Sequence, residues 1–258
     1  MNIIYMGTPE FAVPTLVALF ENGYNISLVI TQEDKPKGRG KKLQYTPVKE
    51  KALELGLKVF QPKYINYEDS VEIIKNIKPD FIIVAAYGQI LKKEILDIPR
   101  YGCLNVHASL LPKYRGAAPI NWSIIKGDTE TGISIMKMEE GLDTGDIVLK
   151  ESIKIDERDD SVSIHDKLSQ LGGDLIIKAM KEIIAERAKF QKQDNAQSSY
   201  APMIFKETGH IDWNNSGKDI VNLVRGLKPW PNAFTIYKDE VVKIHKTRFI
   251  PCKSNHNY

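Results

Sequence analysis

The stretch Asp80-Phe81-Ile82-Ile83-Val84-Ala85-Ala86 is a nearly continuous apolar run, as expected for a strand buried on both faces of a parallel sheet. Residues 2–6 and 26–31 form similar runs, residues 11–20 between them carry apolar side chains at helical spacing, and residues 103–107 form a further candidate strand. This alternation predicts βαβ units. We therefore expect an α/β, Rossmann-like domain with a mostly parallel sheet and a ligand site beyond the carboxyl ends of its strands.

The second half of the chain extends this domain. A helix is predicted over residues 116–125 and a longer one over 161–187. Residues 132–138 and 147–155 alternate in polarity, which favours antiparallel additions to the sheet. The domain is therefore expected to cover residues 1–188.

A polar segment that follows, over residues 189–206, is expected to be a linker. Beyond it, a helix is predicted around residues 217–227, and the β-like runs 233–237 and 241–245 predict a smaller β-domain over residues 207–258. About fifty residues are few for an independent β-domain. The sequence is therefore expected to hold only the opening of that domain.

Bulk composition is that of an ordinary globular protein, with 42% hydrophobic and 27% charged residues among 258. No apolar run approaches the roughly 18 to 20 residues that cross a bilayer, and the N-terminus lacks a signal-peptide pattern. The two cysteines, Cys103 and Cys252, form no CxxC pattern, which excludes a zinc-finger site and gives no hint of a disulfide framework. A cytoplasmic protein without a membrane segment is therefore expected.

The net charge of +3 is small, but the basic residues are unevenly distributed. Between Glu33 and Lys51, seven Lys or Arg residues face three acids, and from Lys206 onward nine face five. Each cluster alone is typical of a solvated surface. Two such segments flanking one candidate active site favour a polyanionic partner.

The chemistry of the chain is indicated by Asn105, His107 and Asp143. Asn105 and His107 are two residues apart, so on a strand their side chains leave the same face. An amide donor beside an imidazole, with a carboxylate to hold the imidazolium, suits negative charge that develops on a carbonyl oxygen. No Ser or Cys has an obvious activating neighbour, and no metal-ligand spacing is present, so direct acyl transfer to an incoming nucleophile is favoured.

Other motifs leave alternatives open. The turn Gly7-Thr8-Pro9-Glu10 lacks the GxGxxG pattern of a dinucleotide site, which favours a structural turn or one that touches a substrate phosphate. Leu110-Leu111-Pro112 is either ordinary packing or the rigid wall of a pocket for a flat organic molecule. Arg115 and Gly116 serve either a substrate anion or the surface, and Asp143 taken alone is also a plausible turn residue.

Three stretches of the chain resemble the folate-dependent formyltransferases. They are Met6-Gly7-Thr8-Pro9-Glu10-Phe11-Ala12, the run from Asn105 to Ala117 with its HxSLLPxxRG pattern, and Gly141-Leu142-Asp143-Thr144-Gly145-Asp146. The basic loop from Lys35 to Lys42, Asp212-Trp213 and Trp230-Pro231-Asn232-Ala233 are similar to the branch that acts on tRNA.

This resemblance implies 10-formyltetrahydrofolate as the formyl donor, the α-amine of methionyl-initiator tRNA as the acceptor, and no metal. It implies that Asn105, His107 and Asp143 are the catalytic residues and that the smaller domain is OB-like; a monomer is expected. Folate contacts are implied for the residues Tyr87, Gly88, Gln89, Ile90, Ser109, Leu110, Leu111, Pro112 and Leu142. Contacts to the tRNA acceptor stem are implied for the basic-loop residues Lys35, Lys37, Arg39, Lys41 and Lys42.

Four other functions are considered, and the first two use the same trio. A relative could formylate a small amine, such as an aminosugar nucleotide or glycinamide ribonucleotide, but such an enzyme has no use for the basic loop. A hydrolase could release formate from formyl-folate with water in place of the amine. An RNA-binding protein with a relic catalytic fold is disfavoured by the intact trio, and a dehydrogenase by the missing glycine pattern.

Overall fold

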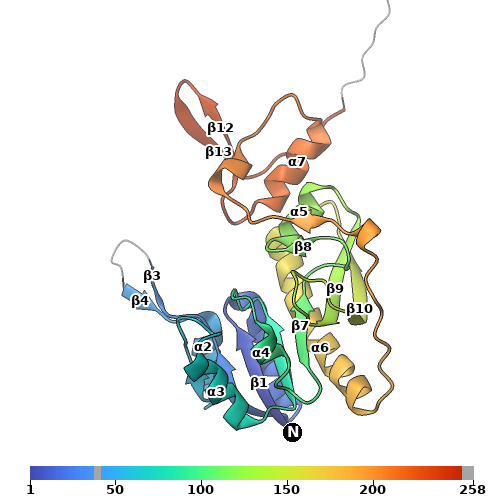
Figure 1. Ribbon diagram of the computed structural model, residues 1–258. Helices are drawn as coiled ribbons and strands as arrows, with labels where there is room; N and C mark the ends of the chain where they lie inside the picture. Colours follow the sequence, from blue (N-terminus) through green and yellow to red (C-terminus); the bar gives the residue numbers. More distant parts are fainter. Residues whose placement is uncertain (38–41, 252–258) are drawn as a thin grey trace, which may run out of the picture.

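A seven-stranded sheet forms the centre of the larger domain (Figure 1), in a computed structural model that describes residues 1–37 and 42–251. The strand order is β10-β9-β7-β6-β1-β2-β5. Strands β7 to β5 run parallel, and β9 and β10 are antiparallel additions, so the predicted mostly parallel α/β fold is confirmed. The sheet strands are β1 (Asn2–Gly7), β2 (Asn25–Ile30), β5 (Val59–Phe60), β6 (Phe81–Ala85), β7 (Cys103–His107), β9 (Glu130–Lys137) and β10 (Ile147–Lys154).

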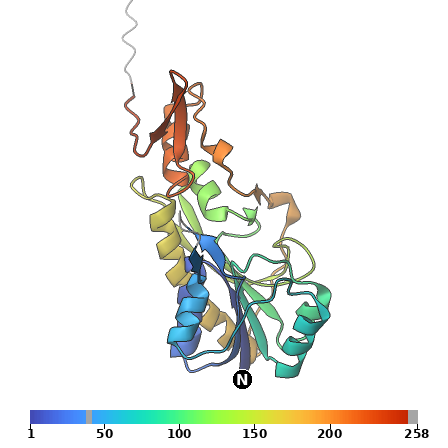
Figure 2. The ribbon, with the colours of Figure 1, turned by 90° about the vertical axis from the view of Figure 1, so that its left-hand side faces the viewer.

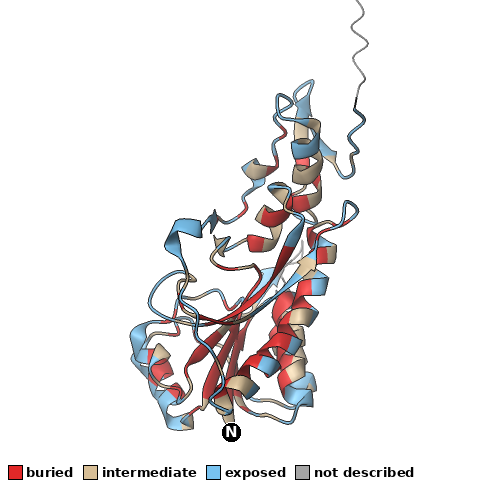
Figure 3. Cartoon of the chain, turned by 90° about the vertical axis from the view of Figure 1, so that its right-hand side faces the viewer, coloured by how far each residue is buried: buried red, intermediate tan, exposed pale blue. Residues whose placement is uncertain are grey.

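Helices cover both faces of this sheet and bury its apolar side chains. Leu16 of α1 and Met180 of α6 belong to the buried cluster on one face, and Ile74 of α3 and Ile95 of α4 to the cluster on the other. Figure 3 shows the buried residues concentrated along the sheet and the helix faces that meet it. The helices are α1 (Val13–Glu21), α2 (Pro47–Glu54), α3 (Glu68–Ile77), α4 (Lys93–Leu96), α5 (Pro119–Ile125), α6 (Ser161–Ile184) and α7 (Gly217–Gly226), with single 3-10 turns at Glu10–Ala12, Asn195–Gln197 and Lys206–Gly209.

Strand β6 is the middle strand of the seven-stranded sheet. All five of its residues are buried, as the apolar run predicts for a strand covered by helices on both faces. Its Val84 pairs with Asn105 of β7, so the two strands end side by side at the same edge of the sheet. That edge is where a parallel α/β sheet is expected to carry its site.

The C-terminal domain is small and contains antiparallel strands. Helix α7 and the hairpin of β12 (Ala233–Tyr237) and β13 (Glu240–Ile244) share a core that includes Ile211 and Val224. The Arg225 guanidinium donates to the backbone carbonyls of Asp156, Glu157 and Asp159 in the loop before α6. Figures 1 and 2 show this domain beyond α5 and the amino end of α6.

Several local features differ from the sequence prediction. Residues 115–116 form β8 (Arg115–Gly116) rather than the start of a helix, because Gly116 has φ 116°, and α5 begins only at Pro119. Strand β8 pairs with β11 (Tyr200–Ala201), so the segment expected to be a linker is hydrogen-bonded along the larger domain. The basic loop contains the antiparallel hairpin of β3 (Lys35–Lys37) and β4 (Lys42–Gln44). No helix within the described residues has the length and apolar character needed to cross a membrane.

Candidate active site

Strand β7 places Asn105 and His107 in the interior of the sheet, near its carboxyl edge. Parallel β6 lies on one side of this strand and antiparallel β9 on the other, where Asn105 pairs with Met136 and His107 with Ser134. His107 is buried and Asn105 is half-buried. Because β7 is bonded on both sides, its backbone holds these two side chains in a fixed relation to one another.

Asp143 reaches both side chains from the loop between β9 and β10. The Asn105 amide nitrogen lies 3.5 Å from Asp143 Oδ1, and His107 Nδ1 lies 3.7 Å from Asp143 Oδ2. The Gly116 backbone amide donates to Asp143 Oδ2 at 2.8 Å. The structure therefore brings the three predicted catalytic residues together, with only 13% of the Asp143 side chain exposed.

A backbone carbonyl determines which imidazole nitrogen of His107 carries the hydrogen. His107 Nε2 lies 3.0 Å from the carbonyl oxygen of Tyr114, a residue in left-handed conformation with φ 59°. A carbonyl can only accept, so Nε2 carries the hydrogen and donates. Nδ1 is consequently the nitrogen that faces Asp143 and that is available to gain or share a proton.

Gln193 was missed by the sequence analysis. Its Nε2 donates to the carbonyls of Asp143 and Gly145, both at 2.8 Å. Its Oε1 accepts from Arg115 Nε at 3.0 Å and Nη2 at 2.8 Å, and Nη2 also donates to Asn195 at 2.9 Å. Arg115, for which the sequence left two readings open, is thus engaged with its own chain. No local sequence signal connects residues that lie 50 or 78 positions apart.

The segment 87–90 follows β6 and forms the neighbouring part of the edge. Its backbone is held because Thr8 Oγ1 and Gln32 Nε2 donate to the Tyr87 carbonyl at 2.8 and 3.0 Å. Gly88 has φ 89°, and a side chain there would collide with Gln32. The Gln89 side chain accepts from the Ile65 amide and donates to the Lys63 carbonyl, so its polar atoms are used within the chain.

Two apolar side chains and one hydroxyl characterise the predicted donor pocket. Ile90 is 78% exposed and Leu142, which precedes Asp143 in the chain, is 51% exposed, so both offer apolar surface to a ligand. The Tyr87 hydroxyl is buried without a hydrogen-bond partner among residues 1–37 and 42–251, and burial raises the pKa of this phenol above its usual value. Exposed apolar side chains of this kind suit a flat organic ligand.

Residues 109–112, the predicted wall of the donor pocket, are hydrogen-bonded to strand β9. Ser109 and Leu111 are fully buried, whereas Leu110 and Pro112 are partly exposed. Ser134 Oγ links the run to β9 by donating to the Ser109 carbonyl at 2.7 Å and accepting from the Leu111 amide at 3.0 Å. Of these four predicted folate contacts, Leu110 and Pro112 are the two with exposed surface that a ligand can contact.

Three of the predicted tRNA-contacting residues lie on the hairpin β3–β4. Lys35 is exposed and contributes to β3; Lys37 belongs to β3 and Lys42 to β4, and Arg39 and Lys41 lie outside the described residues. Figure 1 shows the hairpin projecting from the larger domain at the end of the sheet that also faces the C-terminal domain. The hairpin is therefore a protrusion beside the site and supplies none of the trio.

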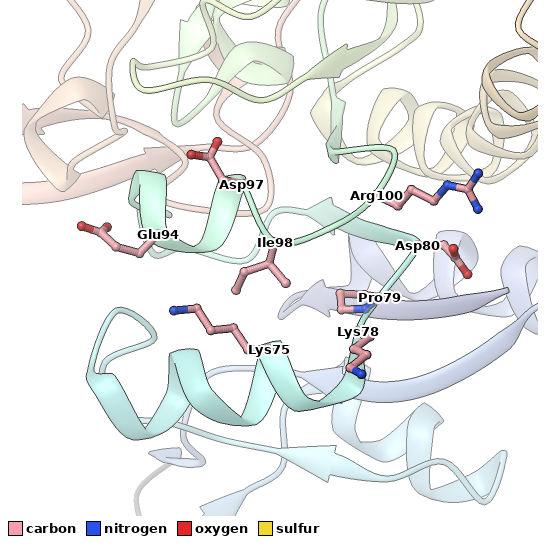
Figure 4. A pocket seen from close by; sticks show the side chains of 8 residues that line it. All are labelled: Lys75, Lys78, Pro79, Asp80, Glu94, Asp97, Ile98 and Arg100. Atoms are coloured by element: carbon pink, nitrogen blue, oxygen red, sulfur yellow. The ribbon is translucent and has the colours of Figure 1, made fainter.

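A cavity of about 630 Å³ lies at the opposite edge of the sheet, between α3 and α4 (Figure 4). It begins where β6 begins, and Asp80 at that point accepts from the Asn2 backbone amide at 2.7 Å. The cavity is far along β6 and β7 from the trio, and its mixed charges favour no single ligand class. Its charged lining residues are Lys75, Lys78, Asp80, Glu94, Asp97 and Arg100.

Solved structures share this fold. A sugar N-formyltransferase from Shewanella superposes with a TM-score of 0.73 at 21% identity, covering 97% of this chain and 99% of that one. HypX from Aquifex aeolicus, solved in complex with tetrahydrofolic acid, superposes with a TM-score of 0.69 at 17% identity, covering 94% of this chain and 37% of that one. At these identities the likeness establishes the fold alone.

Sequence comparisons reach further. The family model described as formyl transferase matches residues 1–180, and its C-terminal domain matches residues 203–257. Methionyl-tRNA formyltransferase of Caldanaerobacter subterraneus subsp. tengcongensis is 52% identical over 97% of this chain and 81% of its own length. The Clostridium perfringens enzyme of that name is 52% identical over 99% of this chain and 82% of its own length. With both family domains present in order and half the residues identical to these relatives, the chain belongs to the formyl transferase family.

Proposed function

We propose that this chain transfers a formyl group from 10-formyltetrahydrofolate to the α-amino group of methionyl-initiator tRNA, for translation initiation. The observation that carries the proposal is the convergence of Asn105, His107 and Asp143 at one sheet edge in a chain that is 52% identical to methionyl-tRNA formyltransferases. We further propose that the chain acts in the cytoplasm and as a monomer.

The reaction forms one bond and breaks another. The amine nitrogen attacks the formyl carbon, and a tetrahedral intermediate places negative charge on the former carbonyl oxygen. The bond between that carbon and the folate nitrogen then breaks, the amine loses a proton, and the folate nitrogen gains one. The protein must therefore stabilise an oxyanion and move a proton.

Each member of the trio has the geometry for part of this task. The Asn105 amide has a second N–H to donate to the oxyanion, and His107, when protonated, donates from Nδ1 because Nε2 is held by Tyr114. Asp143 orients Nδ1 and accepts the amine proton directly or through water. Its carboxylate is itself oriented by the Gly116 amide.

The donor would be held by backbone and apolar contacts. We assign the pterin to the edge formed by Tyr87, Gly88, Gln89 and Ile90 together with Leu142, and the wall to Ser109, Leu110, Leu111 and Pro112. Exposed Ile90 and Leu142 support this assignment. The donor supplies the activated formyl carbon, and the residues orient it and exclude water.

The acceptor would be held by two basic regions. We assign the tRNA acceptor stem to the basic-loop residues Lys35, Lys37, Arg39, Lys41 and Lys42, because cations outside the trio can contact phosphates without entering the site. We retain residues 1–188 as the catalytic domain, 189–206 as the connection and 207–258 as the C-terminal tRNA-binding domain. The matched family regions, 1–180 and 203–257, support this division.

The experiment is formyl transfer from 10-formyltetrahydrofolate with two acceptors, charged initiator tRNA and free methionine. Transfer to the charged tRNA alone supports the proposal. Transfer to a small amine without tRNA formylation, or release of formate with no acceptor, overturns it in favour of a small-amine formyltransferase or a hydrolase. Asp143→Asn is the control, because every one of these activities uses the same carboxylate.

A further inference from the structure

The connection between the two domains runs across the active-site loops. The Ile147 and Gln191 backbones exchange two hydrogen bonds, of 2.8 and 2.9 Å, beside the Asp143 loop. Further along, the Arg115 amide donates to the Ser199 carbonyl at 2.9 Å, and the Tyr114 amide donates to Ser199 Oγ at 2.9 Å. The segment 191–201 is thus fastened on the Asp143 side and on the side that holds His107.

Within residues 189–200, only Gln193 is not exposed. Its amide occupies the space between the Asp143 loop and Arg115, with both ends satisfied by the four hydrogen bonds described above. The amide has only one orientation here. A flip would set its oxygen against two carbonyls and its NH₂ group against a guanidinium.

The carbonyl that Gln193 holds belongs to a strained residue. Asp143 has φ 53°, a left-handed conformation that costs a non-glycine residue about 1 kcal/mol or more. Such a conformation persists only where the surroundings enforce it. The Asp143 carboxylate also has to stay within contact distance of Asn105, His107 and the Gly116 amide. The donated hydrogen bonds to the Asp143 and Gly145 carbonyls fix the backbone on both sides of Thr144, and thereby the direction in which the carboxylate leaves the chain.

We propose that Gln193, anchored by Arg115, is a positioning residue that holds the Asp143 backbone in its left-handed conformation and so aims the carboxylate at His107 and the reacting amine. The proposal rests on the proposed function of the trio. Gln193 touches neither substrate and acts only through Asp143. The segment between the domains is therefore part of the catalytic apparatus as well as a tether.

Two substitutions of Gln193 test whether this residue positions Asp143 or only fastens the segment 191–201 to the larger domain. Gln193→Glu keeps an acceptor for Arg115 but removes both donors to the loop and places a second carboxylate near Asp143. Gln193→Leu removes both ends. Gln197→Leu is the matched control, because Gln197 is exposed in the same segment and bonds only to Asp194. We expect kcat for formyl transfer to fall about 10- to 100-fold in both Gln193 variants, with KM for the charged tRNA changed less than about twofold.

A double-mutant cycle supplies the decisive readout. If Gln193 acts through Asp143, Gln193→Glu costs less than about threefold when added to Asp143→Asn, because the group it positions is already gone. A full additional loss in that background, or a wild-type kcat in both Gln193 variants, overturns the proposal. Should Asp143→Asn itself keep full activity, the role of the trio fails instead, and should the parent chain not formylate charged tRNA, the proposed function fails, so these failures are distinguishable. Gln193→Glu preserves the Arg115 contact and serves if the leucine variant does not fold.

Discussion

The trio at the carboxyl edge of the sheet and the hairpin β3–β4 are opposites in construction. Asp143 and its neighbours are held by hydrogen bonds from Gly116 and Gln193, and the His107 side chain is only 6% exposed. The hairpin has two short strands, and its Leu43 is 70% exposed and Lys35 also lies on the surface. One region hides its polar groups in fixed positions, and the other exposes Lys35 and Leu43.

The difference follows from what each region is proposed to do. Stabilising an oxyanion requires donors that are already in place and shielded from water, because reorganisation during the reaction would cost rate. Contacting an RNA backbone requires accessible cations, and the contact depends on charge rather than on exact placement. Substitutions should therefore affect kcat in the first region and affinity in the second.

The largest effect is expected from Asn105→Ala. It removes one donor to the oxyanion, so kcat should fall about 10²- to 10³-fold with little change in the KM for charged tRNA. Asn214→Ala is the control, because Asn214 is exposed and bonds only to Asp212. Steady-state formylation assays decide the matter, and an Asn105→Ala enzyme within threefold of the parent would remove Asn105 from the trio.

Gly116→Ala tests whether the buried region tolerates any displacement. At φ 116°, a Cβ would lie 2.6 Å from the Tyr200 ring and 2.8 Å from the Ala201 carbonyl, and the amide that holds Asp143 would have to move. We expect the free energy of unfolding to fall by about 1–3 kcal/mol, together with kcat.

Gly23→Ala is the matched control for that substitution. Gly23 has φ 74° but nothing within 4 Å of the added Cβ, so it carries backbone strain without collision. Its cost should be no more than about 1 kcal/mol, with kcat unchanged. Equal losses of stability and activity in the two variants, measured by urea unfolding and formylation, would show that packing around Gly116 is irrelevant.

A smaller effect is expected from Arg39→Ala on the basic loop. Loss of one phosphate contact should weaken binding of charged tRNA by about 1.5 kcal/mol and reduce the slope of log affinity against log salt by about 1, while folate binding is unchanged. Lys181→Ala, an exposed cation on α6, is the control. Binding titrations at several salt concentrations test this, and equal loss of folate and tRNA binding would sink the assignment.

The smallest effect on stability, and one that depends on pH, is expected at the contact between the two domains, where Asp160 accepts a hydrogen bond from Lys228. Burial alone would raise the pKa of Asp160, but hydrogen bonds from the Ser163 and Val162 amides and from the Lys228 ammonium outweigh burial and hold this pKa below its usual value. Stability from a carboxylate of this kind is present above its unfolded pKa of about 3.9 and is lost as pH falls through the folded pKa.

Asp160→Ala should therefore lower the free energy of unfolding by about 1 kcal/mol at pH 7, as the cap of α6 is removed, and by less at pH 3. Denaturant unfolding at both pH values measures the difference. Asp97→Ala, which breaks only an exposed pair with Lys93, should change stability by less than about 0.5 kcal/mol. An unchanged Asp160→Ala effect between pH 7 and pH 3 contradicts the electrostatic explanation.

Much of the fold was predictable because its strands are apolar runs between helical patterns. The expected strand over 103–107 coincides with β7, and the antiparallel strands expected over 132–138 and 147–155 overlap β9 and β10. Helix 116–125 began too early, because the left-handed φ of Gly116 depends on pairing with β11, which no local pattern reveals. The hairpin β3–β4 was missed for a similar reason, since Lys-rich strands lack apolar alternation.

The site was predictable only in part. Asn105 and His107 share one strand, so their two-residue spacing carries geometric information, and a family motif drew attention to Asp143. Gln193 and the Tyr114 carbonyl were invisible, because a polar segment without periodicity resembles a linker and a backbone carbonyl has no sequence identity. The segment expected to be a linker shows that polar composition predicts surface location without excluding a structural role.

The most direct test of the contrast between the two regions is steady-state formylation of charged initiator tRNA, measured over a wide range of tRNA concentrations for Asp143→Asn and Arg39→Ala in parallel. The contrast predicts that Arg39→Ala regains the parental rate at saturating tRNA, whereas Asp143→Asn stays at least about 10²-fold slower at every concentration. A saturating rate that is equally depressed in both variants, or restored in both, would contradict the division of chemistry and docking between the buried trio and the basic loop.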